Sequence, residues 1–359
     1  MYAALTSLGD SIPAAYYVVD GDSMYVWGGG DPGTRYPEIK SESRFVDLLK
    51  GVETTIVFSD HHFQTERYGN GWAWDDYANA YQPERTAFPI YGNRIWIERI
   101  RDSIAVTPFY FNHVLTTEKN TAEKLVRDES GTRYEYRYNP KLPQFRLSTA
   151  ASLYQNDVRF IWEEATGRKI DFQNRSFNPT ARAINGTPRD TLLKLMMYES
   201  DNFVAEQLLL ASSMRQTGVM DENKFIKKFL QNELSGLQDS IAWVDGSGLS
   251  RYNLLSPRAL VKILESIIDL KGIEYVKSIL PAGGVEGTLF NSFKGGKDGP
   301  YIYAKSGALR NVFCLSGILI TKSNKVLLFS WMNNHFNNSD RTKVVNSMER
   351  VLKSLRDNY

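Results

Sequence analysis

The sequence predicts an α+β protein, because its second half contains helices, then strands that can pair antiparallel, then a final helix able to cover them. The first helix is expected after residues 187–190 (TPRD), which supply a capping threonine, a proline and an early acid. A second helix is expected after Ser256-Pro257, where apolar residues follow at helical spacing. The final helix carries its apolar residues between 344 and 355 on one stripe. This order of elements is typical of an α+β domain.

The strands of this second half are three short apolar runs. They lie at residues 301–304, 312–321 and 325–332, and the last two are joined by a tight turn at Ser323-Asn324. A β-hairpin is also expected near the N-terminus, where residues 16–28 alternate around an Asp-Gly-Asp turn.

The middle of the chain differs in composition from the second half. After a turn cluster at residues 28–33, the region from about 35 to 180 is rich in Tyr, Trp and Asn. Its short strand-like runs lie near 55–58, 94–97 and 104–106, without an internal repeat. We therefore expect one or two small mixed domains in this region.

Composition excludes several classes of protein. With 359 residues, the chain has room for two or three domains of roughly 100–200 residues each. Its hydrophobic fraction of 42% and aromatic fraction of 13% exclude a disordered chain. The 43 basic and 41 acidic side chains give a net charge of +2, so neither nucleic acid nor an anionic membrane is an expected partner. No apolar run reaches the length of a membrane span, and no signal peptide is recognised.

Neither cysteine nor histidine chemistry supports a metal or cofactor site. The single Cys314 excludes an internal disulfide, and its apolar neighbours favour a buried small side chain over a reactive thiol. His61 and His62 are adjacent, so on a strand they would point to opposite faces, and no third ligand accompanies them. We expect no metal and no cofactor.

Two polar triplets are the candidate chemical sites. Residues 200–202 (SDN) interrupt an apolar helical stretch, and residues 305–307 (KSG) follow the strand at 301–304. Either triplet alone is ordinary, because Ser, Asp and Asn are common where helices join and Lys-Ser-Gly suits a solvated strand end. Between them lie residues 245–250 (DGSGLS) and 286–289 (EGTL), and chance is a poor explanation for all four in this order.

This order of motifs resembles the penicillin-binding-protein and serine β-lactamase superfamily, whose active sites combine S-x-x-K, S-x-N and K-[ST]-G. More closely, the chain resembles the D-alanyl-D-alanine carboxypeptidases/endopeptidases of peptidase family S13. The resemblance extends over nearly the whole chain. It rests on residues 28–32 (GGGDP), 71–76 (GWAWDD), 199–202 (ESDN), 244–250 (VDGSGLS), 287–289 (GTL), 304–307 (AKSG), 315–317 (LSG) and 333–335 (NNH).

The resemblance implies a fold and a function. The expected catalytic domain is penicillin-binding-protein/serine β-lactamase-like, an antiparallel sheet flanked by helices, built from residues 1–27 and 180–359 with smaller domains inserted at 28–179. The expected activity is that of a cell-wall serine-type D-Ala-D-Ala carboxypeptidase/endopeptidase, which acts on peptidoglycan stem peptides through an acyl-enzyme. Stem peptides ending in D-Ala-D-Ala are the implied partner, β-lactams the implied ligands of the full-length form, and the periplasm or cell envelope the implied location.

The resemblance also gives each residue of the two triplets a role. Ser200 would relay a proton toward the leaving amine, and Asn202 would hold the substrate amide. Lys305 would supply positive potential for the terminal carboxylate, and Ser306 would hydrogen-bond it in place of the family's commoner threonine. Gly307 would let the backbone come close to the substrate.

Two further substrate-binding residues are implied. The N–H of Ala308 would be one donor of the oxyanion hole, whose second donor is the amide of the nucleophilic serine. Asp76 would face the active site and bind the ammonium of a diamino acid in the stem peptide. From the residues alone, the segment 71–76 favours a structural aromatic corner, and both interpretations stay open.

One departure from the family pattern concerns the nucleophile. No serine of the 359 residues is followed by a lysine at the third position after it, and the nearest matches are threonines at 116, 121, 166 and 191. Residues 3–8 (AALTSL) resemble the end of the helix that carries this motif, so we expect a truncated chain that is inactive as it stands. The alternative is a non-catalytic peptidoglycan-binding pseudoenzyme, and the DNA upstream of the start codon distinguishes the two. An esterase or β-lactamase-like hydrolase is disfavoured, because residues 245–250 point to the cell-wall branch.

Overall fold

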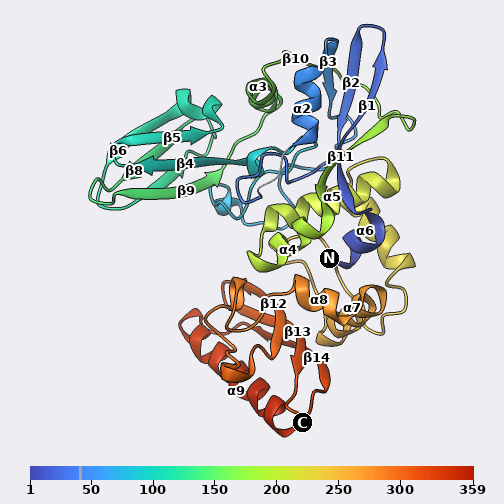
Figure 1. Cartoon of the computed structure of the whole chain (residues 1–359), viewed down its shortest axis with the longest axis vertical. Helices are drawn as coiled ribbons and strands as arrows, with labels where there is room; N and C mark the ends of the chain where they lie inside the picture. The colour runs from blue at the N-terminus through green and yellow to red at the C-terminus, as the bar shows by residue number, and fades with distance from the viewer. Residues whose placement is uncertain (40–42) are drawn as a thin grey trace. The chain divides into compact units, whose positions relative to one another are not determined.

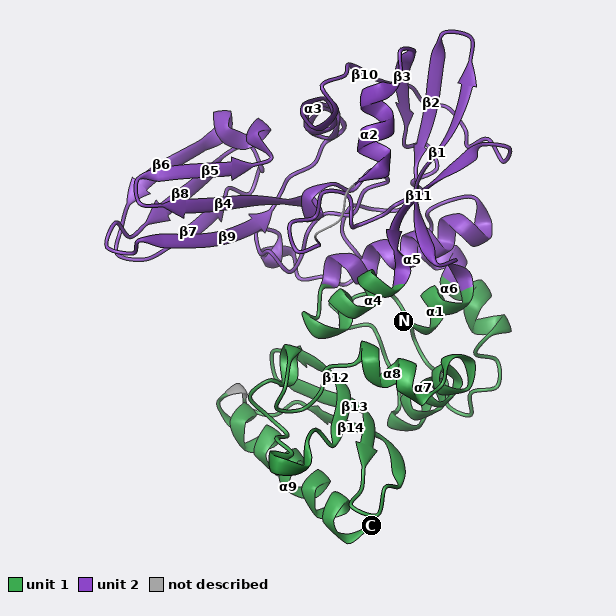
Figure 2. Ribbon diagram, viewed as in Figure 1, with its two compact units in different colours: residues 1–6, 190–201, 226–359 green, residues 7–189, 202–225 purple. Residues whose placement is uncertain are grey.

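The computed structural model describes residues 1–39 and 43–359, which form two compact units (Figure 2). Unit 1 consists of Met1–Thr6, Asp190–Asp201 and Ile226–Tyr359, and unit 2 of Ser7–Arg189 and Asn202–Phe225. These limits differ from the predicted domain limits, and the division into 1–27 with 180–359 and 28–179 stays a prediction. Both units contain helices and β-sheets, so the predicted α+β class is confirmed.

Unit 2 is built around a five-stranded sheet in the order β10-β3-β2-β1-β11 (Figure 1). Its strands are β1 (Ser11–Asp20), β2 (Ser23–Gly28), β3 (Thr55–Ser59), β10 (Ile170–Phe172) and β11 (Arg182–Pro188). The strands β1 and β2 form the predicted antiparallel hairpin, with Asp20 opposite Ser23. In contrast, β3 runs parallel to both β2 and β10, so the carboxyl ends of these three strands lie at one edge of the sheet.

An aromatic cluster joins two helices of unit 2 to this sheet. These helices are α2 (Arg44–Gly51) and α3 (Gln155–Thr166). The rings of Phe45 in α2 and Trp162 in α3 lie 6.2 and 5.7 Å from the ring of Phe58 in β3. Burial of each such ring contributes about 1.5–3 kcal/mol, so the cluster fixes both helices against β3.

Two three-stranded sheets make up the rest of the strand-rich part of unit 2. The first has the order β5-β4-β9, and the second has the order β6-β8-β7. Their strands are β4 (Arg94–Ile100), β5 (Ser103–Thr107), β6 (Leu115–Lys119), β7 (Lys124–Arg127), β8 (Tyr134–Tyr138) and β9 (Gln144–Ala150). The strands predicted near 55–58, 94–97 and 104–106 are confirmed as parts of β3, β4 and β5.

Buried ion pairs also stabilise unit 2. Arg85, whose side chain is 0% exposed, lies 3.1 Å from Glu206 of α5 (Asn202–Thr217) and 3.1 Å from Glu222 at the start of α6 (Glu222–Asn232). Beside it, Glu84 pairs with Arg127 at 2.9 Å. Each of these buried charges has a partner of opposite sign, which compensates for the lost hydration.

Unit 1 contains an antiparallel sheet of three strands in chain order, β12 (Ile302–Leu309), β13 (Val312–Ile320) and β14 (Val326–Asn334). All three predicted strands are confirmed, but the first extends five residues beyond the predicted end at Ala304, to Leu309. The triplet at 305–307 therefore lies within β12, not after it. The prediction stopped short because the apolar run ends at Ala304.

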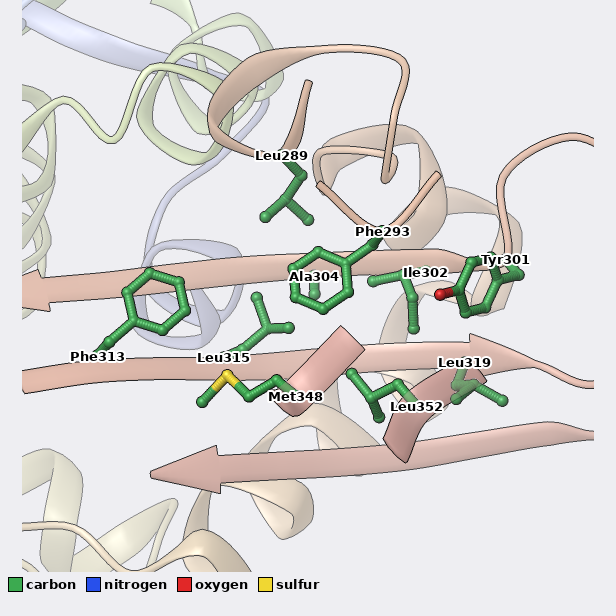
Figure 3. Close-up of a cluster of buried hydrophobic side chains, with 10 residues drawn as sticks. All are labelled: Leu289, Phe293, Tyr301, Ile302, Ala304, Phe313, Leu315, Leu319, Met348 and Leu352. Carbon is green, nitrogen blue, oxygen red and sulfur yellow. The ribbon is translucent and has the colours of Figure 1, made fainter. Parts of the chain in front are cut away.

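The final helix, α9 (Arg341–Asn358), covers one face of this sheet as predicted. Its Met348 and Leu352 lie in one cluster with Leu315 and Leu319 of β13, and all four side chains are at most 1% exposed (Figure 3). This core fixes one face of β12 and β13, so the opposite face of the sheet is the one free for other elements.

Two other helices begin where the sequence predicts. The helix α4 (Arg189–Tyr198) begins within the signal at 187–190, although Thr187 and Pro188 are the last residues of β11 and not the cap and first turn of the helix. The helix α7 (Pro257–Lys271) follows Ser256, whose hydroxyl accepts from the Ala259 N–H at 3.0 Å. The remaining short helices are α1 (Tyr2–Ser7), α8 (Ile273–Ile279), η1 (Trp74–Asp76), η2 (Tyr91–Asn93), η3 (Phe109–Val114), η4 (Gly287–Leu289), η5 (Gly296–Asp298) and η6 (Asn338–Asp340). Within the described residues, no helix combines the length and the apolar composition needed to cross a membrane.

Candidate active site

Ser200 occupies the turn between α4 and α5. The first helix ends at Tyr198 and the second begins at Asn202, as expected from the polar interruption at 200–202. Ser200 has a φ of 56°, in the left-handed region that residues other than glycine rarely adopt. Backbone strain of this kind concentrates at functional sites, so the turn is the first structural sign of one.

Lys305 lies in β12 on the sheet face opposite α9. Successive residues of a strand point to opposite faces, and its neighbour Ala304 belongs to the core that α9 covers. The Lys305 Nζ donates to the Ser200 Oγ at 2.7 Å and also to the carbonyl of Ser306. The structure therefore brings together two predicted residues that are 105 positions apart in the sequence.

The ammonium of Lys305 has unusual electrostatic surroundings. Among the residues that the structure describes, its partners are a hydroxyl and a carbonyl, and none is a carboxylate. Burial lowers the pKa of Lys305 from 10.5 to about 8. An ammonium that has lost hydration without gaining a counter-ion favours the binding of an anion.

Ser306 is connected to the Ser200 turn through the segment at 286–289. Its Oγ donates to the Oγ1 of Thr288 at 3.1 Å. The neighbouring Gly287 has a φ of 58°, and a Cβ at that position would lie 2.8 Å from the carbonyl oxygen of Tyr198. Only glycine therefore lets η4 approach the end of α4 this closely.

Gly307 and Ala308 continue β12 along an outer edge of the sheet. Residues 281–283 cover the first half of this edge, where the Ala304 N–H donates to a carbonyl at 3.1 Å. Because N–H directions alternate along a strand, the Ala308 N–H points to the same side as that of Ala304. A Cβ on Gly307 would meet no atom within 4 Å, so there is open space beside the strand.

Tyr81 connects Asn202 and Asp76 in unit 2 by a hydrogen bond to each of them. The sequence analysis did not identify Tyr81 as a site residue. The Asn202 Nδ2 donates to the Tyr81 carbonyl at 2.9 Å, and the Tyr81 hydroxyl donates to the Asp76 Oδ1 at 2.6 Å. Burial and the hydrogen bond to Asp76 raise the pKa of Tyr81. A second donor, the Asn79 Nδ2, lies 3.1 Å from the same carboxylate oxygen, which is therefore held in one position.

The segment at 245–250 is a self-contained structural loop. Asp245 is 3% exposed, its Oδ1 accepts from the Gly248 N–H at 2.8 Å, and its Oδ2 accepts from the Ser250 N–H at 2.6 Å. The Asn253 Nδ2 donates to the same carboxylate at 2.7 Å. These bonds close the loop on itself, so its residues shape unit 1 instead of supplying a reacting group.

The structure gives the two adjacent histidines different surroundings. His62 is 1% exposed, its Nε2 lies 2.8 Å from the Gly28 carbonyl oxygen, and burial lowers its pKa to about 4. His61 is exposed. Over the described ranges 1–39 and 43–359, no group of three His, Cys, Asp or Glu side chains is placed to hold a metal ion.

A row of hydroxyls beside Lys305 was missed by the sequence analysis. Lys305 is paired in register with Ser316 of β13, and Ser316 with Ser330 of β14, so all three side chains lie on one face. The Ser316 Oγ donates to the Ser330 Oγ at 2.8 Å. The sequence signal was a single serine in each of two apolar strands, but only the register shows that both lie beside Lys305.

These groups can bind an anion and move a proton. The Lys305 ammonium and the Ser306 hydroxyl can hold a carboxylate, and the free edge of β12 can pair with an extended peptide. The Ser200 hydroxyl is within hydrogen-bond distance of the Lys305 amine. The pKa of Lys305, about 8, lies near neutral pH, so this amine can exchange a proton with the hydroxyl.

Comparison with protein families identifies the family to which this chain belongs. Residues 176–355 match the model of the D-Ala-D-Ala carboxypeptidase 3 (S13) family. The match extends over half of the chain and includes Ser200, Asn202, Lys305 and Ser306.

Individual relatives match over different lengths. The D-alanyl-D-alanine carboxypeptidase DacB of Haemophilus influenzae is 25% identical over an alignment of 324 residues, which covers 81% of this chain and 67% of that protein. The carboxypeptidase DacB of Mycolicibacterium smegmatis is 28% identical over 184 residues, 49% of this chain and 40% of that protein.

Solved structures show the same fold. The crystal structure of penicillin binding protein 4 (dacB) from Haemophilus influenzae matches with a TM-score of 0.74 at 20% identity, over 99% of this chain and 88% of that chain. A crystal structure of that protein complexed with a β-lactam matches with a TM-score of 0.66 at 19% identity, over the same shares of both chains. The predicted penicillin-binding-protein type of fold is thereby confirmed.

Proposed function

Because this chain belongs to the D-Ala-D-Ala carboxypeptidase 3 (S13) family, we propose that it is a cell-wall peptidase whose Lys305 site binds the D-Ala-D-Ala end of peptidoglycan stem peptides. The periplasm or cell envelope is the proposed location, because its substrate is found there. The observation that carries the proposal is the 2.7 Å contact between the Lys305 Nζ and the Ser200 Oγ, made by an ammonium that has no carboxylate partner among the described residues. Such a group is suited to the terminal carboxylate of a peptide.

In the proposed complex the peptide lies extended along the outer edge of β12. Lys305 and Ser306 hold its terminal carboxylate, and the Ala308 N–H faces the carbonyl of the D-Ala-D-Ala bond as an oxyanion donor. Ser200 relays a proton through its hydroxyl toward the leaving amine. Gly307 leaves space for the peptide backbone, since no atom lies within 4 Å of a Cβ built there.

Two residues of unit 2 have proposed roles with the same substrate. Asn202 holds an amide of the stem peptide, and Asp76 binds the ammonium of its diamino acid. Support for the second role comes from the Asp76 carboxylate, which the Tyr81 hydroxyl holds in position at 2.6 Å. A carboxylate oriented in advance binds a cation at a lower entropic cost.

A binding experiment tests the role of Lys305. Calorimetry would compare a peptide ending in D-Ala-D-Ala with its C-terminal amide, on the unchanged protein, on Lys305→Met and on the control Lys353→Met, an exposed lysine of α9. Loss of one charge-assisted contact should weaken binding by about tenfold to a hundredfold. We expect amidation of the peptide and Lys305→Met each to weaken binding by this factor. The two changes together should weaken binding no more than either change alone. Additive losses would contradict contact between Lys305 and the carboxylate.

Acylation is the second part of the proposal. We propose that these 359 residues do not form an acyl-enzyme, because none of their serines is followed by lysine at the third position. Mass spectrometry after incubation with benzylpenicillin should show no covalent adduct. An adduct mapped to Ser200 would overturn the assignment of this residue as a proton relay.

A second candidate function is favoured by the same missing motif. A pseudoenzyme that binds peptidoglycan peptides would keep Lys305 and Ser306 and need no nucleophile. Release of D-alanine from a stem peptide, followed by chromatography, separates the two functions. Turnover that Lys305→Met abolishes would favour the peptidase and overturn the absence of an acyl-enzyme proposed above, whereas binding without turnover agrees with that absence and favours the pseudoenzyme.

A further inference from the structure

A pocket of about 480 Å³ lies within unit 2, in a part of the chain that the proposed chemistry does not use. It is located where β3 and β10 end and where α3 begins, and β10 both pairs with β3 and contacts α3. The two strands are parallel, and ligands of α/β sheets commonly bind beyond the carboxyl ends of parallel strands. The volume falls within the roughly 300–1,000 Å³ of ordinary small-ligand sites.

The polar lining of the pocket can both donate and accept hydrogen bonds. Asp60 and His61 follow β3, Gln155 is the first residue of α3, and Gln173 and Asn174 follow β10. Carboxylate oxygens accept, while each amide offers a carbonyl oxygen and an NH2 group. Hydroxyl and acetamide groups, which also both donate and accept, match this lining.

Part of this lining is already oriented. The Gln155 Nε2 lies 3.3 Å from one carboxylate oxygen of Asp60 and 3.5 Å from the other. The carboxylate therefore has a fixed neighbour on one side and lone pairs left for a ligand. Of the residues described in the structure, no lysine or arginine lines the pocket, so the Asp60 charge would repel an anionic ligand.

Two aromatic rings supply an apolar surface in the same pocket. Phe63 and Phe172 are half-buried, and they are the apolar members of the lining. A sugar ring has an apolar face of C–H groups and an edge of hydroxyls, so it can contact a ring and the amides at the same time. A purely apolar ligand would leave the amides and the carboxylate without partners.

We propose that this pocket binds the glycan of peptidoglycan, a chain of neutral sugars that carry hydroxyl and acetamide groups. The identity of the glycan rests on the proposed function, whereas the sugar chemistry rests on the pocket alone. The Asp60 carboxylate accepts from sugar hydroxyls, the amides of Gln173 and Asn174 pair with the acetamide, and Phe63 contacts the C–H face.

The test uses the β-1,4-linked tetramer of N-acetylglucosamine, which carries no peptide. Calorimetry would measure its binding to the unchanged protein, to Asp60→Ala and to Gln173→Ala. The matched control is Asp171→Ala, which removes an exposed carboxylate of β10 that does not line the pocket. Thermal melting of each variant shows that it is folded, and the exposed Gln173 keeps the test valid if Asp60→Ala fails to fold.

We expect the tetramer to bind the unchanged protein and Asp171→Ala equally, and Asp60→Ala and Gln173→Ala about tenfold or more weakly. Lys305→Met should leave tetramer binding unchanged, because this residue does not line the pocket. No binding of the tetramer, or equal binding by all variants, would overturn the proposal even if stem peptides bind through Lys305. Tetramer binding at the pocket together with a failure of the stem peptide to bind would overturn the proposed function and support the sugar site.

Discussion

Arg85 and Lys305 are two of the cations that the fold removes from solvent, and their surroundings differ. In unit 2, Arg85 is fully buried and lies 3.1 Å from the carboxylates of both Glu206 and Glu222. In unit 1, Lys305 is partly buried, and within the described part of the chain its partners are the Ser200 hydroxyl and a backbone carbonyl. Both side chains lose hydration, which costs free energy. For Arg85, ion pairs with carboxylates of its own chain offset this loss. This difference is what we expect if Arg85 maintains the fold and if Lys305, as proposed, binds the carboxylate of a peptide.

The largest expected effect is on the stability of unit 2. Arg85→Met should destabilise the protein by about 3–5 kcal/mol, because two buried carboxylates lose their counter-ion. Thermal melting measures this loss, and Lys305→Met should cause no comparable loss at neutral pH. Adding Glu206→Gln and Glu222→Gln to Arg85→Met should recover much of it. If the added changes recovered nothing, packing and not charge would be the role of Arg85.

A smaller effect should appear in the pH dependence of stability. The pKa of Lys305 is about 8 in the folded protein and 10.5 as the ordinary value, so the unfolded state binds more protons between these values. The lowered pKa therefore destabilises the folded state below about pH 8, and stability should rise as pH increases from about 8 toward 10.5. Urea unfolding of the unchanged protein and of Lys305→Met on both sides of this interval measures the effect. Parallel pH curves for the two proteins would show that the folded protein does not disfavour the charged lysine.

The smallest expected effect concerns the partner of Lys305. Ser200→Ala and Ser200→Gly both remove the hydroxyl, but only glycine adopts a φ of 56° without strain. The glycine variant should therefore be more stable than the alanine variant by about 1 kcal/mol. Denaturant unfolding of the pair measures this difference. Equal stabilities would mean that the turn at Ser200 is not strained.

Much of unit 1 could be predicted from the sequence, because its signals are local. Capping at Ser256 fixes the start of α7, and the apolar stripe between 344 and 355 identifies α9. The triplets at 200–202 and 305–307 could be identified by motif, and the structure brings Ser200 and Lys305 together. The length of β12 could not be predicted, because residues after Ala304 are held by pairing with β13 and not by apolar burial.

The features that sequence patterns missed depend on contacts between distant residues. Arg85 and Glu206 are 121 positions apart, and nothing local to either residue shows that they pair. Asp60 and Gln155 are 95 positions apart, and they line one pocket because the tertiary structure brings the start of α3 to the end of β3. Tyr81 was missed for the same reason, since its contacts with Asp76 and Asn202 are made by tertiary structure.

The central claim, that Lys305 is an ammonium held in readiness for a peptide carboxylate, is tested most directly by its own titration. NMR of protein labelled with ¹³C-lysine would follow the Lys305 Cε signal against pH, with Lys305→Met identifying the signal. The account predicts a pKa of about 8 in the free protein, raised by a peptide ending in D-Ala-D-Ala and unchanged by the C-terminal amide. A pKa near 10.5 in the free protein, or one that the peptide does not move, would contradict it.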